Sequence, residues 1–225
     1  AAVPLKLSST PTTSNTLAES LRITNSGYVG IGTSTPNNLL QVANLINFDN
    51  TRSTTLIGYQ AGQSNTGTYN AALGHQALLS NTTGYFGTAV GSTALYSNTI
   101  GTDDTAVGTA ALYSNTDGVY NTVVGSGTAY NNTTGDNNTA VGSAALYYSQ
   151  TGSGNTAVGR YAGFGTFNNS FSNNSLFGWQ AGYALSTGSN NILLGYQAGD
   201  NLTTGGNNIV IGYNIDAPSA TSANI

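Results

Sequence analysis

A short apolar segment that ends in glycine recurs along most of the chain, most often as Thr-Ala-Val-Gly. Successive copies lie 17 residues apart in seven of nine steps, with one step of 16 and one of 19. The glycines that end the segments, called anchor glycines here, are Gly58, Gly74, Gly91, Gly108, Gly125, Gly142, Gly159, Gly178, Gly195 and Gly212. A period of 17 residues is too short for a helical repeat, which needs about 33 residues or more. The pattern predicts an all-β chain: a parallel β-solenoid (β-roll) of about ten 17-residue coils over residues 54–215, each coil with two short strands and two turns.

Two adjacent apolar residues precede every anchor glycine, and they predict how each strand is oriented. Neighbouring residues of a strand point to opposite faces. The residue directly before the glycine is large, as at Val107 and Leu194, and we expect it to line the lumen of the coil. The residue before that is often alanine, which suits close contact with another copy of the chain. The residues predicted for this interchain packing are Ala89, Ala106, Ala140 and Ala157.

Small and polar residues recur in the same register. A small residue, usually alanine, stands three positions after most anchor glycines, and it predicts a second strand with a narrow interior. Clusters of Asn, Thr and Gly, such as residues 80–84 and 131–135, indicate turns. An asparagine stands four positions before most anchor glycines and is expected to form an inward ladder from coil to coil. These asparagines are Asn70, Asn121, Asn138, Asn155, Asn174, Asn191 and Asn208.

The two ends of the chain depart from the repeat. Residues 1–53 are predicted to form an N-terminal extended segment and a β-hairpin connector, with strands at 21–24 and 28–32 around the turn Asn25-Ser26-Gly27. Residues 216–225 are predicted to form a C-terminal tail. Because the last two coils carry three consecutive apolar residues, we expect residues 174–213 to form a wider, better packed base. The chain has no methionine, so we expect it to be a processed piece of a longer precursor.

Composition excludes several classes of function. Charged residues make up 5% of the chain, and the four basic residues are scattered, so no nucleic-acid interface is expected. There is no cysteine and one histidine, which excludes thiolate and multi-histidine metal sites. No recurring carboxylate pair suggests acid–base catalysis, and no apolar run is long enough to insert into a membrane. The chain is therefore predicted to be no enzyme and to bind no cofactor or metal. Aspartates are too irregular for a calcium roll, and one threonine per strand is too few for an ice-binding array.

An aromatic column is one candidate contact surface. It stands five residues after successive anchor glycines and consists of Tyr96, Tyr113, Tyr130, Tyr147, Phe164 and Tyr183. Two interpretations are open: a rail that docks sugar rings, or rings that stack on one another and cover the edge of the coils. The 19-residue step adds Phe167 and Phe171 in a loop near 164–173, which is expected to protrude. These phenylalanines either contact a partner or fold back to plug a defect between coils.

Two sequence resemblances bear on function. The unit Asn-Thr-Ala-Val-Gly-x-x-Ala-Leu, with its Thr-Thr-Gly turn, is similar to the repeats of trimeric autotransporter adhesin heads, which form left-handed β-rolls with three chains around one axis. Residues 21–36 resemble a segment of phage tail-fibre proteins and related surface fibres, and residues 211–218 resemble the stretch that precedes their cleavable chaperone domain. That chaperone domain is absent from the 225 residues.

The resemblances imply a homotrimeric fibre that acts at the cell surface or elsewhere outside the cell, as a non-enzymatic structural or adhesin segment presenting a repetitive surface. A phage tail-fibre segment on the virion that binds a host-surface glycan is an alternative. A second alternative is a self-polymerising filament subunit, whose residues 1–16 would add a strand to the sheet of the next subunit.

Overall fold

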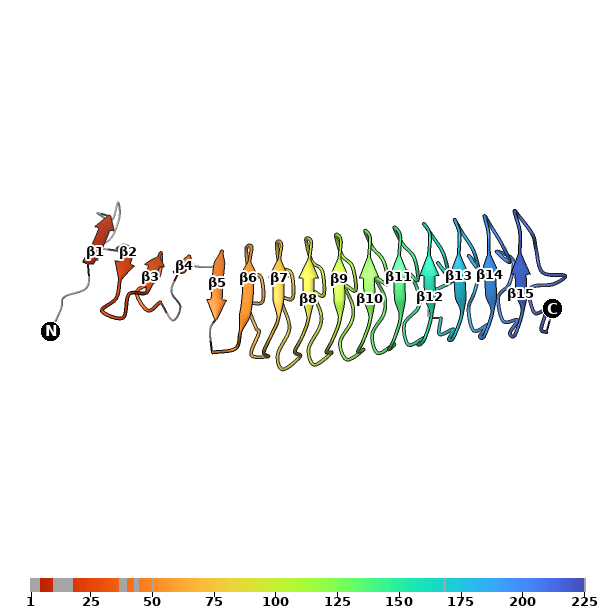
Figure 1. The fold of residues 1–225 in the computed structure, drawn as a ribbon, viewed down its shortest axis with the longest axis horizontal. Coiled ribbons are helices and arrows are strands. Elements are labelled where there is room, and N and C mark those ends of the chain that lie inside the picture. Colours follow the sequence, from red (N-terminus) through yellow and green to blue (C-terminus); the bar gives the residue numbers. More distant parts are fainter. Residues whose placement is uncertain are drawn as a thin grey trace.

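The computed structural model describes residues 5–9, 18–36, 40–42, 45–49, 51–167 and 169–224. They form a rod with one 15-stranded sheet, in which the strands follow one another in chain order (Figure 1). The strands are β1 (Leu5–Ser9), β2 (Ala18–Ile23), β3 (Val29–Ile31), β4 (Leu40–Val42), β5 (Ile46–Asp49), β6 (Thr54–Ile57), β7 (Ala71–Leu73), β8 (Thr88–Val90), β9 (Thr105–Val107), β10 (Thr122–Val124), β11 (Thr139–Val141), β12 (Thr156–Val158), β13 (Ser175–Phe177), β14 (Ile192–Leu194) and β15 (Ile209–Ile211). The predicted all-β parallel solenoid is confirmed.

The parallel part of the sheet runs from β6 to β15, with one strand per coil. Each strand pairs with the next without a register shift, so that Thr105 lies beside Thr122 and Ala106 beside Val123. The 19-residue step between β12 and β13 keeps the same alignment, since Ala157 pairs with Leu176. The extra residues therefore leave the coil elsewhere, and the sheet itself is uninterrupted.

The N-terminal part of the sheet is mostly antiparallel. β2 and β3 pair antiparallel around the turn at 24–28, as the hairpin signal predicted. β1 pairs antiparallel with β2, and β5 joins this region to the solenoid by pairing antiparallel with β6. Of the predicted extended arm, residues 5–9 form β1, and residues 1–4 and 10–16 lie outside the described residues.

The orientation of the solenoid strands is the reverse of the one predicted from residue size. Ala89, Ala106, Ala140 and Ala157 are fully buried in the core of their own chain, so their assignment to an interchain contact is wrong. The larger residues beside them point outward instead, as shown by Leu194 (45% exposed) and Ile211 (62% exposed). The reason lies on the opposite wall of the coil. There the leucine four residues after the anchor glycine fills the lumen and leaves room for little more than a methyl group. These leucines are Leu78, Leu95, Leu112 and Leu146, all buried.

The second strand predicted for each coil is absent between residues 51 and 167, where each coil has a single strand. The segment after the anchor glycine turns instead, because Thr93 (φ 55°) and Leu95 (φ 50°) are both left-handed, and the equivalent residues repeat these angles. A left-handed residue interrupts extended backbone. Burial of the leucine side chain offsets the conformational cost at that position.

The anchor glycines stack so closely that a side chain cannot be added. Gly91 has φ 134°, and a Cβ on it would lie 2.4 Å from the carbonyl oxygen of Gly108 in the next coil. Only glycine combines this backbone angle with this approach. The recurrent glycine of the sequence pattern is thus explained by coil-to-coil packing.

Asparagine side chains form two buried ladders inside the turns. The ladder predicted four residues before the anchor glycines is confirmed. Asn138 donates from its backbone N–H and its Nδ2 to Oδ1 of Asn121, at 3.0 and 3.1 Å, and Asn155 does the same to Asn138. A second ladder, which the sequence pattern shows only as turn clusters, consists of Asn65, Asn81, Asn98, Asn115 and Asn132. The ladders satisfy polar groups that a solenoid must bury.

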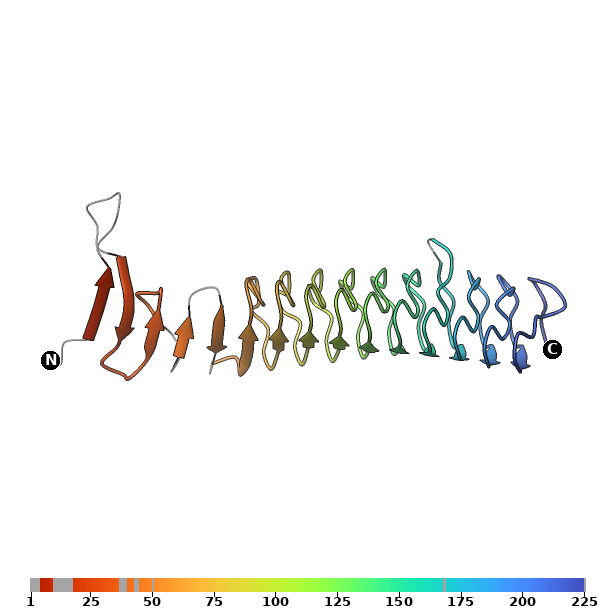
Figure 2. The same cartoon turned by 90° about the horizontal axis from the view of Figure 1, so that it is seen from above.

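The loop at the 19-residue step protrudes from the row of turns, as predicted (Figure 2). Its phenylalanines have different environments. Phe171 is fully buried in the core and acts as the predicted plug, whereas Phe167 is 71% exposed. The predicted better packed base is wrong for the single chain, because Ile192 and Ile209 lie on the exposed face of β14 and β15.

Candidate functional site

No group of three or more His, Asp or Glu side chains that could hold a metal ion occurs among the described residues. A hollow of about 180 Å³ lies where β4 and β5 meet the first coil. Its lining includes Val42, Leu45, Leu56 and Gln60, and none of the described residues that line it is acidic, basic or histidine. This hollow therefore offers no group for proton transfer. Surfaces along the rod are the better candidates for function.

The outward face of the parallel strands is a uniform surface that runs the length of the solenoid. It carries two rows, one from the first and one from the last residue of each three-residue strand, and is called the outer sheet face here. In the central coils the rows are threonine and valine, as in Thr122 and Val124; in the last two coils both rows are Ile or Leu. No residue of β6–β15 is charged. This uncharged face, and not the alanines, is the surface that the strands present to the outside.

The predicted aromatic column exists, and its rings stack on one another. The centroids of Tyr96 and Tyr113 are 4.9 Å apart with an interplanar angle of 5°, and those of Tyr113 and Tyr130 are 4.9 Å apart at 1°. The stack continues through Tyr147 and Phe164 to Tyr183. Partial burial, together with the neighbouring phenols of Tyr130 and Tyr96, raises the pKa of Tyr113. A sugar docks on the free face of a ring, and here the faces cover each other, which favours the stacking interpretation.

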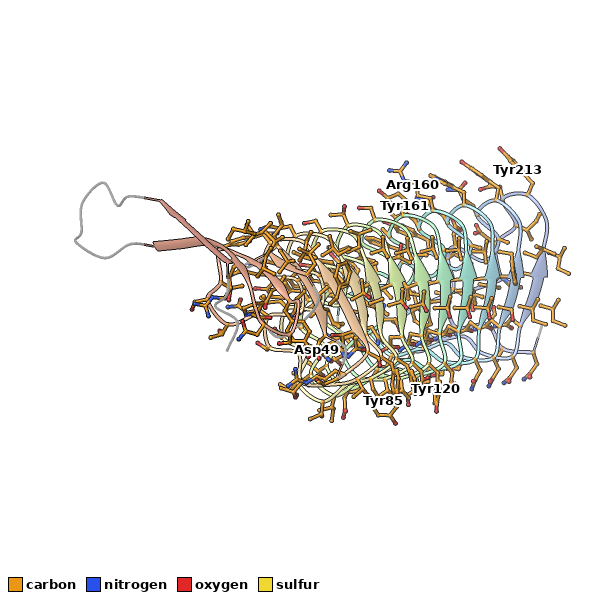
Figure 3. The ribbon with its side chains drawn as sticks, turned by 60° about the vertical axis from the view of Figure 1, so that its left-hand side comes forward. Asp49, Tyr85, Tyr120, Arg160, Tyr161 and Tyr213 are labelled. Carbon is orange, nitrogen blue, oxygen red and sulfur yellow. The ribbon has the colours of Figure 1, made fainter. Side chains whose placement is uncertain are left out.

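A second aromatic row is not among the sequence predictions, because it is present only at the two ends of the solenoid. It occupies the position directly after the anchor glycine. Trp179, Tyr196 and Tyr213 stack at 4.8 and 5.0 Å, and Tyr59 stacks on His75 at 5.6 Å. Figure 3 shows Tyr213 and Arg160 on one edge of the rod and Tyr85 and Tyr120 on the opposite edge.

A third aromatic group lies on that opposite edge and was also missed. Tyr69, Phe86 and Tyr120 stand five residues before their anchor glycines, and Tyr85 precedes Phe86. All four rings are exposed. Tyr69 stacks on Phe86 at 5.0 Å, and Tyr85 contacts Phe86 edge-on at 5.3 Å. The sequence signal is weak, because the same position holds Asp, Asn, Gly or Ser in other coils.

Two carboxyl groups have unusual environments. Asp104 replaces asparagine in the first ladder and is 1% exposed; burial raises its pKa to about 7, although hydrogen bonds from Asn121 act in the other direction. Partial burial also raises the pKa of Asp200, assisted by a hydrogen bond and charge repulsion with Asp216. The buried Asp104 is a structural group without access to a ligand.

Comparison with known proteins gives no match: no family model, no curated protein and no solved structure is similar to this chain. Within the described residues, no helix has the length and apolar character needed to cross a membrane.

Proposed function

We propose that this chain is a non-enzymatic structural segment of an extracellular fibre or adhesin, whose copies associate side by side as a homotrimer through the outer sheet face. The observation that carries the proposal is the exposure of large apolar residues along this face, from Leu73 through Val124 to Ile211. Exposed apolar surface of this extent is typical of association surfaces. Its strands carry no charge, so association buries no unpaired ion.

The period of the face favours another copy as its partner. The rows repeat once per coil, and stacked rings elsewhere in the solenoid give a coil spacing of 4.9 Å. A second rod with the same spacing can place its side chains between these rows along the whole face. Since the strands from β7 to β15 are three residues long, about 10 Å, the face is a narrow strip. Three narrow strips can converge on a common axis, as the resemblance to trimeric adhesin heads implies.

A mechanical role agrees with how the rod is stabilised. Backbone ladders, buried amide ladders and stacked rings repeat from coil to coil, and Arg52 with Asp49 forms an ion pair at the start of the solenoid. The stability of such a rod depends little on ionic strength, because surface ion pairs contribute little to its free energy of unfolding. Extracellular or cell-surface location, with a virion tail as the alternative, rests on the resemblances.

The experiment is to compare the mass in solution of the wild type with that of a double variant, Val124→Asp with Val141→Asp. Both side chains are exposed on the outer sheet face, so the variant should keep its circular dichroism spectrum and become monomeric. A matched control, Asn137→Asp with Asn173→Asp, adds the same charge on the turn edge and should leave the trimer intact. A wild type that is monomeric at tens of micromolar, or a double variant that assembles normally, would refute the proposal.

A further inference from the structure

The aromatic residues on the turn edge occupy a backbone conformation that does not suit them. The residue five positions before each anchor glycine is left-handed in every coil, with φ 58° at Tyr69, 55° at Phe86, 58° at Asp103 and 60° at Tyr120. In later coils this position is occupied by residues that tolerate the left-handed conformation, namely Asn137, Gly154, Asn173, Asn190 and Asn207. Asparagine and glycine adopt it readily, and a bulky side chain does so at a cost in free energy.

Burial does not offset this cost at the aromatic positions. Leu95 and Leu112 are also left-handed, and they are fully buried in the core. In contrast, Phe86 is 49% and Tyr120 60% exposed, so their rings add little to the core. Residues that are both strained and exposed are typical of functional positions rather than of folding.

Asp103 stands in the coil between those of Phe86 and Tyr120. The backbones of this row are joined coil to coil, since Asp103 N–H donates to Tyr85 and Tyr120 N–H donates to Thr102, each at 3.1 Å. Phe86, Asp103 and Tyr120 therefore leave successive coils at the same place, and Phe86 and Tyr120 are separated by two coils, about 10 Å. Tyr69 stacks on Phe86 and Tyr85 contacts it edge-on, and the Phe86 side chain is still 49% exposed. No aromatic ring among the described residues lies against Tyr120.

The charge around this row is negative and uncompensated. Between Arg52 and Arg160 the sequence contains four aspartates and no lysine or arginine. In the described part of the chain, no side chain forms an ion pair with Asp103. Asp136 adds a second carboxylate beyond Tyr120, where it accepts the N–H of Val119 at 2.8 Å.

We propose that Phe86, Asp103 and Tyr120 bind an organic cation, an alkylated ammonium group such as that of choline. A cation midway between the two rings lies about 5 Å from each, within the range in which a ring face attracts a positive charge. Asp103 leaves the coil between the two rings, so its carboxylate would add Coulomb attraction at this position. An alkylated ammonium group is poorly hydrated compared with a metal ion, so it loses little hydration free energy when it moves from water to the ring faces.

The test titrates choline chloride into the protein at constant ionic strength and follows the aromatic proton resonances. Binding with a Kd of about 1 mM is expected for an open site of this kind. The neutral isostere of choline, 3,3-dimethylbutan-1-ol, should bind at least about fivefold more weakly, because the charge is the main source of attraction.

Variants then assign the site. Phe86→Asn, Tyr120→Asn and Asp103→Asn should each raise the choline Kd by about fivefold or more. The first two put asparagine at a left-handed position, so their melting temperatures should equal or exceed that of the wild type, which separates loss of binding from loss of fold. Tyr213→Asn, on the opposite edge, is the control and should bind choline normally.

Three results of the choline experiments would overturn the inference. The first is that choline binds no more tightly than its neutral isostere. The second is that Phe86→Asn and Tyr120→Asn both still bind choline normally. The third is a strong loss of stability in Tyr120→Asn, which would show that the Tyr120 ring has a structural role. Binding of cellotetraose in place of choline, lost in Tyr120→Asn, would assign the row to a neutral sugar and also refute the cation. Sedimentation of the same samples reports association separately, so a failure here is distinct from a failure of the fibre proposal.

Discussion

Replacing Asp104 with asparagine should stabilise the rod in a pH-dependent manner. Asp104 stands in the first asparagine ladder, and its carboxyl accepts the Asn121 N–H at 2.8 Å, the Asn121 Nδ2 at 3.0 Å and the Asn115 Nδ2 at 3.1 Å. The preceding coil has Gly87 at this position, so no ladder side chain joins it from that side. Burial is the largest cause of the raised pKa, and the charges of Asp136 and Asp103 add to it.

The magnitude follows from the pKa. The pKa of Asp104 rises from 3.8 to about 7 on folding, so the folded state binds a proton that the unfolded state releases. The free energy of unfolding is therefore highest below pH 4 and falls as the pH rises to about 7, by about 4 kcal/mol in all. Above pH 7 this contribution is lost and the profile is level.

The amide of the Asp104→Asn variant cannot ionise and can repeat the bonds of its neighbours. In the next coil, Asn121 donates from Nδ2 to the carbonyl of Gly135 at 3.0 Å, and the equivalent acceptor for residue 104 is the carbonyl of Gly118. Asp104→Asn should thus match the wild type near pH 4 and exceed it by about 4 kcal/mol at pH 8. Thermal and urea unfolding between pH 4 and pH 8 measure the difference.

Asp117→Asn is the matched control, because Asp117 is exposed in a turn and its replacement changes the net charge equally. It should leave the pH profile of the wild type unchanged. Should Asp104→Asn lower the melting temperature at pH 8, or leave the slope between pH 4 and pH 7 intact, then the buried carboxyl is not the source of the pH dependence.

Two further predictions concern the region of the 19-residue step. Phe171→Ala should cost about 3 to 5 kcal/mol because it empties a fully buried site, whereas Phe167→Ala at the exposed loop tip should change stability by less than about 0.5 kcal/mol; equal effects in a urea titration would contradict the plug. Ser149→Asn should add about 1 kcal/mol, because Ser149 Oγ is buried without a hydrogen-bond partner and the longer amide can continue the ladder that ends at Asn132. A lower melting temperature for Ser149→Asn would show that the ladder cannot extend there.

The sequence by itself determined the period, the fold class and the first asparagine ladder. Each follows from a local constraint repeated in every coil. Gly91 and its equivalents are fixed by close contact with the next coil, and Asn138 and its equivalents are fixed by buried amide bonds to the coil before. A repeat makes such constraints visible because every copy must satisfy them.

Only the tertiary structure decided which way the strands face. Size alone suggested that valine fills the lumen and alanine meets a partner, but the volume left for the strand residue depends on what the opposite wall contributes. That wall carries Leu95 and Leu112, whose left-handed backbone directs their side chains into the lumen. No residue type in the segment predicts this left-handed turn. The lumen is already full, so the small residue of the strand points in and the large one points out.

The outer sheet face depends on this reversal, and the aromatic row on the turn edge depends on the stacking of coils. Val124 is on the outer sheet face because Val123 is inside. Phe86, Asp103 and Tyr120 are 17 residues apart in sequence. That they form one row on the surface is recognised only when the coils are stacked in register. The sequence pattern determines which structural unit repeats. Packing between the two walls of a coil, and between successive coils, determines which side chains are exposed to a partner.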